Sequence, residues 1–309
     1  MPNKQASLCL FLWLAVLGAT AGAARSPISL DILRRDGYGS VDLIKSGANR
    51  LFVPADVNGK KFKLLLDTGF GVEGIGIGGT AAELRLTPLK EKKRTIVQTA
   101  GGAVGALEAG MAQSVVLGNV HIQGAPIYVY KGSGGVLGRG FLHTNSAIID
   151  LTNLKLYLRP PRTGKGADLG HALAALGMGQ ASFAGMTGGT YTMDVEVNGV
   201  PTKLVIDTGA QMTVLDTRFA KQAKLRGWDR RGWEAVDAAG VRSEMDFAGT
   251  NSFKIGGIPI RTPTITMTTI PYYSESGGKV AGVLGLDVLG LNWSIIDFGQ
   301  NKLYFARAK

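Results

Sequence analysis

Short apolar runs that end at glycine-containing turns recur along most of this chain. Apolar runs bounded by turn residues are typical of β-strands, and alternating positions indicate strands with one exposed face. We expect strands at Lys61–Leu66, Val115–Leu117, Val120–Ile122, Ala147–Ile149, Leu154–Leu158, Lys203–Ile206, Phe253–Ile255, Ile258–Ile260, Ser294–Ile296 and Lys302–Phe305. Helical spacing is confined to Thr80–Leu86, Asp216–Lys224 and Val288–Leu291. The pattern therefore predicts an all-β fold with short helices.

The sequence also repeats itself at long range. Val57-Asn58-Gly59 precedes Asp67-Thr68-Gly69 just as Val197-Asn198-Gly199 precedes Asp207-Thr208-Gly209, at an offset of 140 residues. Three further blocks recur at an offset of 147 residues: Gly135–Gly138 as Gly282–Gly285, Ile148–Asp150 as Ile295–Asp297, and Lys155–Tyr157 as Lys302–Tyr304. Blocks in one order at nearly fixed spacing indicate a duplication. We expect two similar lobes, residues 27–160 and 185–309, joined by a linker at 161–184.

The composition excludes several other classes of protein. Glycine contributes 45 of the 309 residues without a collagen-like period, 45% of the residues are hydrophobic, and only 18% are charged. Such a chain is neither fibrous nor disordered. The net charge of +11 is scattered, and basic residues are not interleaved with aromatic ones. We therefore expect no nucleic-acid partner and a basic surface that serves solubility.

Residues 1–24 have the layout of a secretory signal peptide. Lys4 is followed by the apolar run Leu8–Leu17 and then by small residues. The candidate cleavage sites follow Ala21, Ala23 and Ala24. The apolar run is shorter than the ~20 residues of a membrane-spanning helix, although an uncleaved anchor is an alternative interpretation. We expect an exported protein, in the bacterial periplasm or secreted, with no integral membrane segment after signal cleavage.

The only cysteine, Cys9, lies inside this signal segment. The mature chain would therefore have no disulfide and no cysteine nucleophile. An export signal without disulfides fits a bacterial envelope better than a eukaryotic secreted protein. The three histidines form no zinc-binding or Ser-His-Asp pattern, so we expect no metal site.

Two aspartates stand at equivalent points of the repeat. Asp67 and Asp207 each follow an apolar strand and precede Thr-Gly. A buried carboxylate is costly unless it is paired or hydrogen-bonded, and the glycine permits a tight turn with close backbone approach. A twofold axis between the halves would bring the loops together, so that the two carboxyls share one proton. Such a pair combines a general base with a general acid and needs no cofactor.

At these motifs the chain resembles the retropepsin-like aspartic proteases. The resemblance is carried by Leu65-Leu66-Asp67-Thr68-Gly69, Val205-Ile206-Asp207-Thr208-Gly209-Ala210, Val136-Leu137-Gly138-Arg139-Gly140-Phe141-Leu142 and Val283-Leu284-Gly285-Leu286-Asp287-Val288-Leu289. It covers nearly all of residues 50–305 and implies two pepsin-like β-barrel lobes related by a pseudo-twofold axis. It also implies that an apolar strand ending in glycine supports each aspartate loop, with a short helix after it.

The resemblance implies a role for each residue of the candidate site. Asp67 and Asp207 would form the catalytic dyad, and Thr68 and Thr208 would interlock the two loops. The glycines expected to support these loops are Gly69, Gly138, Gly209 and Gly285. The expected flaps are hairpins around Thr99–Gly105 and Ala238–Ser243, with Thr99, Ala100, Gly101, Gly102, Ala239 and Gly240 at their centres.

Three features depart from the family pattern. Phe70 stands where the family usually has a small residue, neither Phe70 nor Ala210 carries a hydroxyl, and neither flap contains a tyrosine. A hydroxyl at these two positions would stabilise the ionised aspartate and lower its pKa. Without one, we predict a pH optimum less acid than that of pepsin.

The expected function is that of an exported aspartic endopeptidase. Its partners would be peptide or protein substrates, and it would act as a monomer that contains an internal pseudo-dimer. Two alternatives stay open. One is a non-catalytic peptide-binding envelope protein, an interpretation that Phe70 favours, and the other is a structural envelope protein.

Other residues allow two interpretations each. Asp150 and Asp297 are duplicated and would be a second carboxylate pair or, as we favour, the first residues of turns after buried strands. Arg139 would pair with an acid of its own lobe or lie on the surface. Trp228 and Trp233 would line a substrate cleft or, as we favour, pack in a surface loop.

Overall fold

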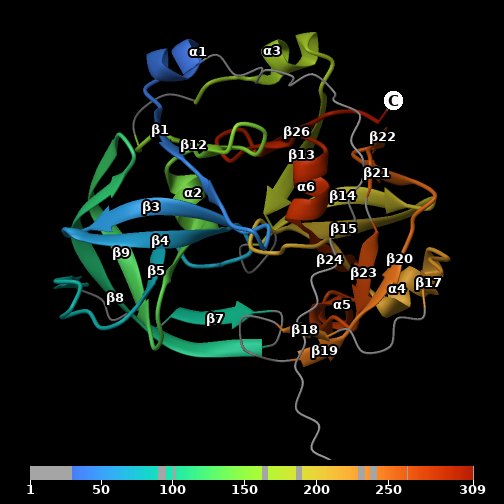
Figure 1. Ribbon diagram of the computed structural model, residues 1–309, viewed down its shortest axis with the longest axis horizontal. Coiled ribbons are helices and arrows are strands. Elements are labelled where there is room, and N and C mark those ends of the chain that lie inside the picture. The colour runs from blue at the N-terminus through green and yellow to red at the C-terminus, as the bar shows by residue number, and fades with distance from the viewer. Residues whose placement is uncertain are drawn as a thin grey trace, which may run out of the picture.

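The computed structural model describes residues 30–89, 95–99, 102–161, 166–185, 190–228, 234–236, 242–262 and 264–308. Strands dominate both halves of the chain, and each helix of the described residues has five or six residues. The prediction of an all-β fold with short helices is therefore confirmed. Figure 1 shows most strands of the N-terminal half, blue to green, on the left and most strands of the C-terminal half, yellow to red, on the right.

The N-terminal half contains twelve strands and two helices among the described residues. These elements are α1 (Leu30–Arg35), β1 (Gly39–Asp42), β2 (Ile44–Lys45), β3 (Leu51–Val57), β4 (Lys60–Asp67), β5 (Ile75–Gly78), β6 (Thr87–Pro88), β7 (Thr95–Thr99), β8 (Gly102–Leu117), β9 (Val120–Tyr130), β10 (Gly135–Gly138), α2 (Arg139–Thr144), β11 (Ile148–Asp150) and β12 (Lys155–Leu158).

The rest of the chain contains fourteen strands and four helices among the described residues. Its elements are α3 (Gly170–Ala175), β13 (Gly179–Gly185), β14 (Tyr191–Val197), β15 (Val200–Ile206), β16 (Val214–Asp216), α4 (Thr217–Gln222), β17 (Gly227–Trp228), β18 (Glu234–Val236), β19 (Arg242–Glu244), β20 (Asp246–Ala248), β21 (Phe253–Ile255), β22 (Ile258–Pro259), β23 (Ile265–Thr268), α5 (Pro271–Glu275), β24 (Val280–Leu284), α6 (Leu286–Leu291), β25 (Ile295–Asp297) and β26 (Lys302–Phe305).

A nine-stranded sheet forms the body of the N-terminal lobe. Its strands lie in the order β2-β3-β4-β10-β5-β9-β8-β6, and β7 pairs with β8. Alternate residues of β3 are buried, as in a strand with one face on the core, and β4 buries Leu64 and Leu66 in the same way. β10 runs parallel to β4 and places Gly138 opposite Asp67. The end of β4 therefore meets the end of β10 at one edge of the sheet.

The C-terminal lobe has the same arrangement at its centre. Its strands belong to a 15-stranded sheet, in which they lie in the order β14-β15-β24-β16-β23-β20-β17, and β21 and β22 are attached through β14. β24 runs parallel to β15 and lies between β15 and β16, as β10 lies between β4 and β5. Both copies of the Asp-Thr-Gly motif thus leave a strand that is supported by a parallel neighbour.

The two halves meet through β11 and β25. These antiparallel strands place Ile149 opposite Ile296, Ile148 opposite Asp297 and Asp150 opposite Ile295. Residues 148–150 correspond to residues 295–297 of the repeat, at an offset of 147 positions. Exchanging the two halves therefore gives the same set of paired residues. The pseudo-twofold axis therefore passes between Ile149 and Ile296.

The repeated Val-Asn-Gly blocks are two equivalent hairpin turns. Asn58 and Asn198 both have positive φ angles, of 50° and 49°. The Asn58 side chain accepts the Ser114 N–H group (3.0 Å) and donates to the Leu84 carbonyl (2.9 Å), and Asn198 makes the matching bonds with Ser252 and Ala223. Asparagine tolerates this backbone conformation, and its amide satisfies a donor and an acceptor at once. This requirement explains why the Val-Asn-Gly block is present in both halves.

The helix predictions are correct in part. α4 is confirmed within its expected range, and Asp216 caps it by accepting the Arg218 N–H group at 2.8 Å. Residues Thr80–Leu86 form hydrogen-bonded turns and not a helix, so that prediction is wrong. The Leu86 N–H group donates to the Ala81 carbonyl. The positive φ of Arg85, 51°, ends the turn. α6 begins at Leu286, two residues earlier than predicted, directly after the extended Gly285.

The segment expected to join the lobes contains α3 and most of β13. β13 pairs with β26 on one side and with β14 on the other, so this part of the chain belongs to the folded sheet. The lobe boundaries stay a prediction. The expected signal peptide, residues 1–24, lies outside the described residues.

Candidate active site

The two Asp-Thr-Gly loops are interlocked through their threonines. The Thr68 N–H group donates to the Thr208 hydroxyl (3.1 Å), and the Thr208 N–H group donates to the Thr68 hydroxyl (3.0 Å). Each hydroxyl then donates across the axis, from Thr68 to the Ile206 carbonyl (2.7 Å) and from Thr208 to the Leu66 carbonyl (2.8 Å). Both threonines are fully buried. These four bonds satisfy polar groups that burial would otherwise leave without partners.

This interlock brings Asp67 and Asp207 face to face. A Cβ atom built on Gly69 would lie 2.7 Å from Asp207 Oδ2, and one built on Gly209 would lie 2.4 Å from Asp67 Cγ. Each carboxyl therefore occupies the space that a side chain in the opposite loop would need. A side-chain hydrogen bond joins the two aspartates. Glycine at both positions is a geometric requirement of this close approach.

Backbone donors surround both carboxyls. Asp67 Oδ1 accepts the Phe70 N–H group at 2.9 Å. Asp207 Oδ1 accepts the N–H groups of Gly209 (2.8 Å) and Ala210 (3.2 Å). Such bonds favour the ionised form of a carboxyl. These bonds therefore stabilise negative charge on two carboxyls that are partly buried.

Burial dominates the titration of the pair. Burial, together with the charge of Asp207, raises the pKa of Asp67 to about 8. Burial also raises the pKa of Asp207, against the opposing effect of its backbone donors. Two interacting carboxyls lose their protons in two steps that belong to the pair. Between these two steps the pair holds one proton and one negative charge.

Two further glycines allow the aspartate loops to pack closely against their supporting strands. A Cβ atom on Gly138 would lie 2.8 Å from the Phe70 carbonyl oxygen, and one on Gly285 would lie 2.5 Å from the Met212 backbone. Backbone atoms cannot give way as a flexible side chain can. The structure thus places all eight of the expected dyad and loop-support residues at the junction of the two lobes, in contact through the interlock or through these strands.

Comparison with known proteins agrees with this geometry. A family model described as aspartyl protease matches residues 53–141 and 193–288, once in each half. The chain belongs to this family. A search of curated proteins found no match to the chain. The predicted resemblance to the retropepsin-like aspartic proteases is confirmed by the two family matches.

The chain is also similar to two solved structures. The aspartic proteinase from Irpex lacteus is 14% identical, with a TM-score of 0.53, and the match covers 88% of this chain and 98% of that one. A retropepsin-like aspartic protease from Rickettsia conorii is 22% identical, with a TM-score of 0.31, and the match covers 39% of this chain and 92% of that one. The first match supports the fold of two related lobes for this member of the aspartyl protease family.

Phe70, the departure from the family pattern, packs into its own lobe. Its ring lies 2.9 Å from the point where a Cβ atom of Gly76 would stand. The ring joins a small apolar cluster that includes Val72, Leu107 and Tyr128. The backbone of the loop keeps the bond found in the other half, since Arg139 N–H donates to the Phe70 carbonyl at 3.1 Å. Phe70 thus fits the aspartyl protease loop, because Gly76 leaves room for it.

Arg139 is buried in this family member, so of its two interpretations the surface arginine is wrong. Only 7% of its surface is exposed. Its Nη1 atom donates to the Gly69 carbonyl at 3.0 Å, inside the Asp67 loop. Asp67 and Asp207 both act on its charge, and burial lowers the pKa of the guanidinium.

Asp287 is a site residue that the sequence analysis missed. Its Oδ1 atom accepts the Thr213 N–H group (2.8 Å) and the Thr213 hydroxyl (2.7 Å), and that hydroxyl accepts the Gly285 N–H group (3.0 Å). It therefore fixes the strand that supports the Asp207 loop. The available signal was the repeat itself, because the first half has Gly140 at the position of Asp287.

The expected flaps fall on two hairpins. Thr99 at the end of β7 pairs with Gly102 at the start of β8, and Val236 of β18 pairs with Arg242 of β19. Ala100, Gly101, Ala239 and Gly240 lie outside the described residues. In the view of Figure 1 both hairpins lie below the region where the lobes meet. The role of these hairpins as flaps stays a prediction.

The other candidates have structural explanations. Asp150 and Asp297 each begin a turn, as we favoured: Asp150 accepts the Thr152 N–H group (3.0 Å) and Asp297 accepts that of Gly299 (2.9 Å). Trp228 belongs to β17, which pairs with β20. Trp233 lies outside the described residues.

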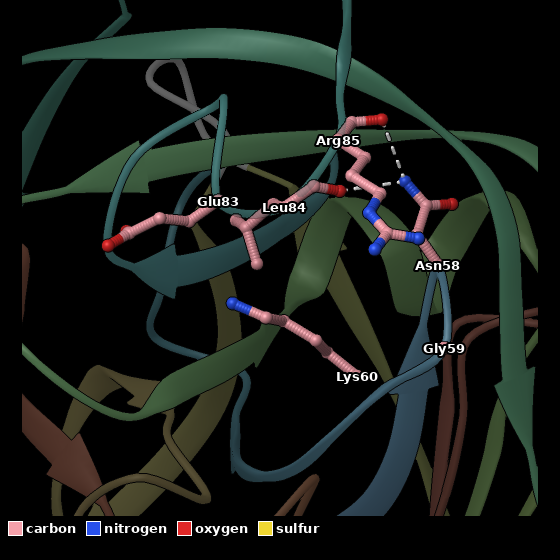
Figure 2. A pocket seen from close by; sticks show the side chains of 6 residues that line it. All are labelled: Asn58, Gly59, Lys60, Glu83, Leu84 and Arg85. Atoms are coloured by element: carbon pink, nitrogen blue, oxygen red, sulfur yellow. Dashed lines mark hydrogen bonds between the residues drawn. The ribbon is translucent and has the colours of Figure 1, made fainter.

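A separate polar pocket of about 170 Å³ lies at the far end of β4. Figure 2 shows its lining residues, Asn58, Gly59, Lys60, Glu83, Leu84 and Arg85. Lys60 begins β4 and Asp67 ends it, which separates this pocket from the aspartates by roughly 23 Å at the usual rise of a strand. The pocket surrounds the Asn58 turn and has no acidic pair, so we assign it a structural role and not a catalytic one.

The described residues contain no group of three or more acidic, histidine or cysteine side chains that could hold a metal ion. Within the same residues, no helix has both the length and the apolar character required to cross a bilayer.

Proposed function

We propose that this member of the aspartyl protease family hydrolyses internal peptide bonds with the Asp67–Asp207 pair. One observation carries the proposal: two partly buried, hydrogen-bonded carboxyls face each other across the axis of a duplicated fold. Carboxyls in this arrangement hold one proton between them. That state supplies a base and an acid at one place.

The proposed reaction uses both members of the pair. The ionised carboxyl removes a proton from a water molecule, which attacks the carbonyl carbon of the peptide bond. The protonated carboxyl donates to the carbonyl oxygen as negative charge develops there. When the tetrahedral intermediate breaks down, the carboxyl that took the proton from water gives it to the leaving amine. The other carboxyl takes back the proton that it gave to the carbonyl oxygen, which restores the pair. General acid-base catalysis of this kind contributes about 10²–10⁴-fold to a rate.

The environment of the pair supports this chemistry. The backbone donors to Asp67 and Asp207 stabilise the single negative charge of the pair. Burial raises the pKa of Asp67 to about 8 and so keeps the one remaining proton on the pair near neutral pH. The threonine interlock fixes the two loops before substrate arrives, which avoids reorganisation during the reaction.

The proposed substrate is a peptide or an unfolded protein. An extended chain would bind between the lobes and add main-chain hydrogen bonds to strand edges and to the two hairpins. The non-catalytic alternative rested on Phe70. Since that ring packs into the lobe against Gly76, it gives no reason to expect an inactive site.

A cleavage assay tests the function. The purified chain is incubated with an unfolded protein, and internal peptide products are identified by mass spectrometry for wild type, D67N and D207N. We expect products from wild type only. The exposed Asp246 provides a matched control, because D246N makes the same chemical change on β20, four strands away from β15 in the sheet. Equal cleavage by all four proteins would refute the assignment, and binding of peptide without cleavage by wild type would favour the non-catalytic alternative.

Export is a second part of the proposal. It rests on the signal-like character of residues 1–24. Fractionation of cells that express the full chain, followed by N-terminal sequencing, tests it. We expect a processed chain outside the cytoplasm that begins after Ala21, Ala23 or Ala24. An unprocessed cytoplasmic chain would contradict this expectation.

A further inference from the structure

Arg139 is connected to Asp67 through a single peptide group. Arg139 Nη1 donates to the carbonyl oxygen of Gly69 (3.0 Å), and the N–H group of the same peptide, which belongs to Phe70, donates to Asp67 Oδ1 (2.9 Å). A hydrogen bond to the carbonyl of a peptide polarises it and strengthens the bond that its N–H group donates. The charge of Arg139 therefore acts on Asp67 through this peptide as well as directly through space.

The loop is shaped to hold the guanidinium in this position. A Cβ atom on Gly71 would lie 2.5 Å from Arg139 Nη2 and 3.0 Å from its Cζ atom. Gly71 is exposed and its φ is not positive, so neither packing against the core nor backbone conformation requires glycine there. The close contact at this position is with the end of the Arg139 side chain. The Arg139 N–H group also donates to the Phe70 carbonyl, which ties both ends of the residue to the Asp67 loop.

The second half of the chain has no counterpart to this arginine. Leu286 occupies the equivalent position and makes the equivalent backbone bond, from its N–H group to the Ala210 carbonyl at 3.0 Å. The fold therefore does not need a guanidinium at this point in order to support an aspartate loop. A buried cation in one half only costs desolvation, which the fold avoids in the other half.

We propose that Arg139 is a positioning residue of the Asp67–Asp207 pair: it holds the Gly69–Phe70 peptide against Asp67 and stabilises the negative charge that the pair carries. This inference rests on the proposed function, because it concerns the same two aspartates. Arg139 contacts the loop and not the reacting atoms. Its effect is on the protonation of the pair and on the orientation of Asp67.

Other titratable groups lie around Arg139. Asp67 and Asp207 face it from the two loops, and the Tyr191 hydroxyl acts on it from β14. His143 of its own helix stacks on the Tyr191 ring, with centroids 6.1 Å apart. H143N therefore serves as the background in which the pH measurements are repeated.

The test measures the protonation of the pair directly. Carboxyl ¹³C NMR titrations of the full chain, with signals assigned from D67N and D207N, are compared for wild type, R139K and R139Q. Gln can donate to the Gly69 carbonyl but has no charge, whereas Lys keeps the charge. We expect R139Q to raise the pKa values of the pair by about one unit, and R139K to shift them by a few tenths at most. G71A, which displaces the guanidinium from the loop side, is expected to act as R139Q does.

Activity provides a second readout. In R139Q both limbs of the pH–rate profile should move to higher pH, and kcat should fall about tenfold at wild-type optimum while KM changes less than twofold. A purely structural role would lower Tm in R139K and R139Q alike and leave the titration of the pair unchanged, which would overturn the inference. G71A decides the question if both Arg139 variants fail to fold, because it leaves the helix sequence intact.

The two proposals fail in distinguishable ways. If the wild-type chain hydrolyses no peptide, the proposed function fails, but the NMR titrations still decide whether Arg139 acts on the pair. If wild type hydrolyses peptides while R139Q and G71A leave the pKa values unchanged, the inference about Arg139 fails and the function stands.

Discussion

The Thr68 and Thr208 hydroxyl groups each accept the backbone N–H group of the other residue, at 3.0 and 3.1 Å. Each hydroxyl also donates to a carbonyl of the opposite strand. This reciprocal arrangement sets the distance between the two loops, and so it sets the contact between Asp67 and Asp207. The aspartate pair is therefore a property of both lobes together and not of either one.

Replacing one of these threonines by valine is expected to destabilise the protein. In T208V the Thr68 N–H group and the Leu66 carbonyl lose their partners inside the core. Two buried groups without partners cost about 2–4 kcal/mol of unfolding free energy. Urea unfolding of T208V and of T208S, which keeps the hydroxyl, measures this cost.

Activity should follow the same order. T208S is expected to retain most of the hydrolysis, and T208V little of it. If T208V is as stable and as active as wild type, the interlock does not position the pair.

The raised pKa of Asp67 predicts a specific dependence of stability on pH. With a pKa of about 8 in the folded protein, above its value of about 3.9 in the unfolded chain, Asp67 takes up a proton on folding at any pH between these two values. The stability it contributes is present at acid pH and is lost as the pH rises through about 8. Relative to D67N, wild type should lose about 1.4 kcal/mol per pH unit between pH 5 and 7.

Urea unfolding of both proteins at each pH gives this difference. The comparison cancels the contribution of other buried acids such as Asp297, whose pKa burial raises to about 6. A difference that stays flat over this interval would show that Asp67 is not protonated in the folded protein.

A hydroxyl at position 210 is expected to shift activity toward acid pH. The Ala210 N–H group already donates to Asp207 Oδ1, at 3.2 Å, so a side-chain hydroxyl there lies beside the carboxylate. An added donor stabilises the ionised form and lowers the pKa of the pair. The pH–rate profile of A210T should move to lower pH by about half a unit to one unit, while A210V, of equal size, should not move. Equal shifts in both variants would attribute the effect to size.

Phe70 and Gly76 are expected to show strong coupling. In G76A the new methyl group would lie 2.9 Å from the Phe70 ring, and F70A would leave a void in a half-buried cluster. Each single change should cost about 1–3 kcal/mol. In the double variant the methyl group enters the space that the ring has left, so the total cost should be well below the sum. Additive costs would contradict the contact.

The central features of the site could be predicted from sequence because they are duplicated. Asp67 and Asp207 each follow an apolar strand at equivalent points of the repeat, and the twofold relation follows from the repeat. The paired threonines and the close glycines were expected from the resemblance to the retropepsin-like proteases. The structure then gave the physical reasons, namely the shared hydroxyl groups and the contact of each carboxyl with the opposite glycine.

Other features could not be predicted because they depend on contacts in three dimensions. The apolar spacing of Thr80–Leu86 fits a helix and a series of turns equally well, and the Arg85 φ angle decides between them. β8 extends from Gly102 to Leu117, far beyond the expected strand, since its N-terminal part has little alternation. The fit of Arg139 against Gly71 joins residues whose proximity no local pattern reveals.

The rate of peptide hydrolysis by four proteins tests the central claim most directly. Wild type, D67N, D207N and the double variant are assayed with one fluorogenic peptide near neutral pH. If the two aspartates act as one unit, each single variant should lose about 10²–10⁴-fold in kcat, and the double variant should lose no more than the worse of them. A single variant that retains the wild-type rate would contradict the claim that the pair is the catalytic centre.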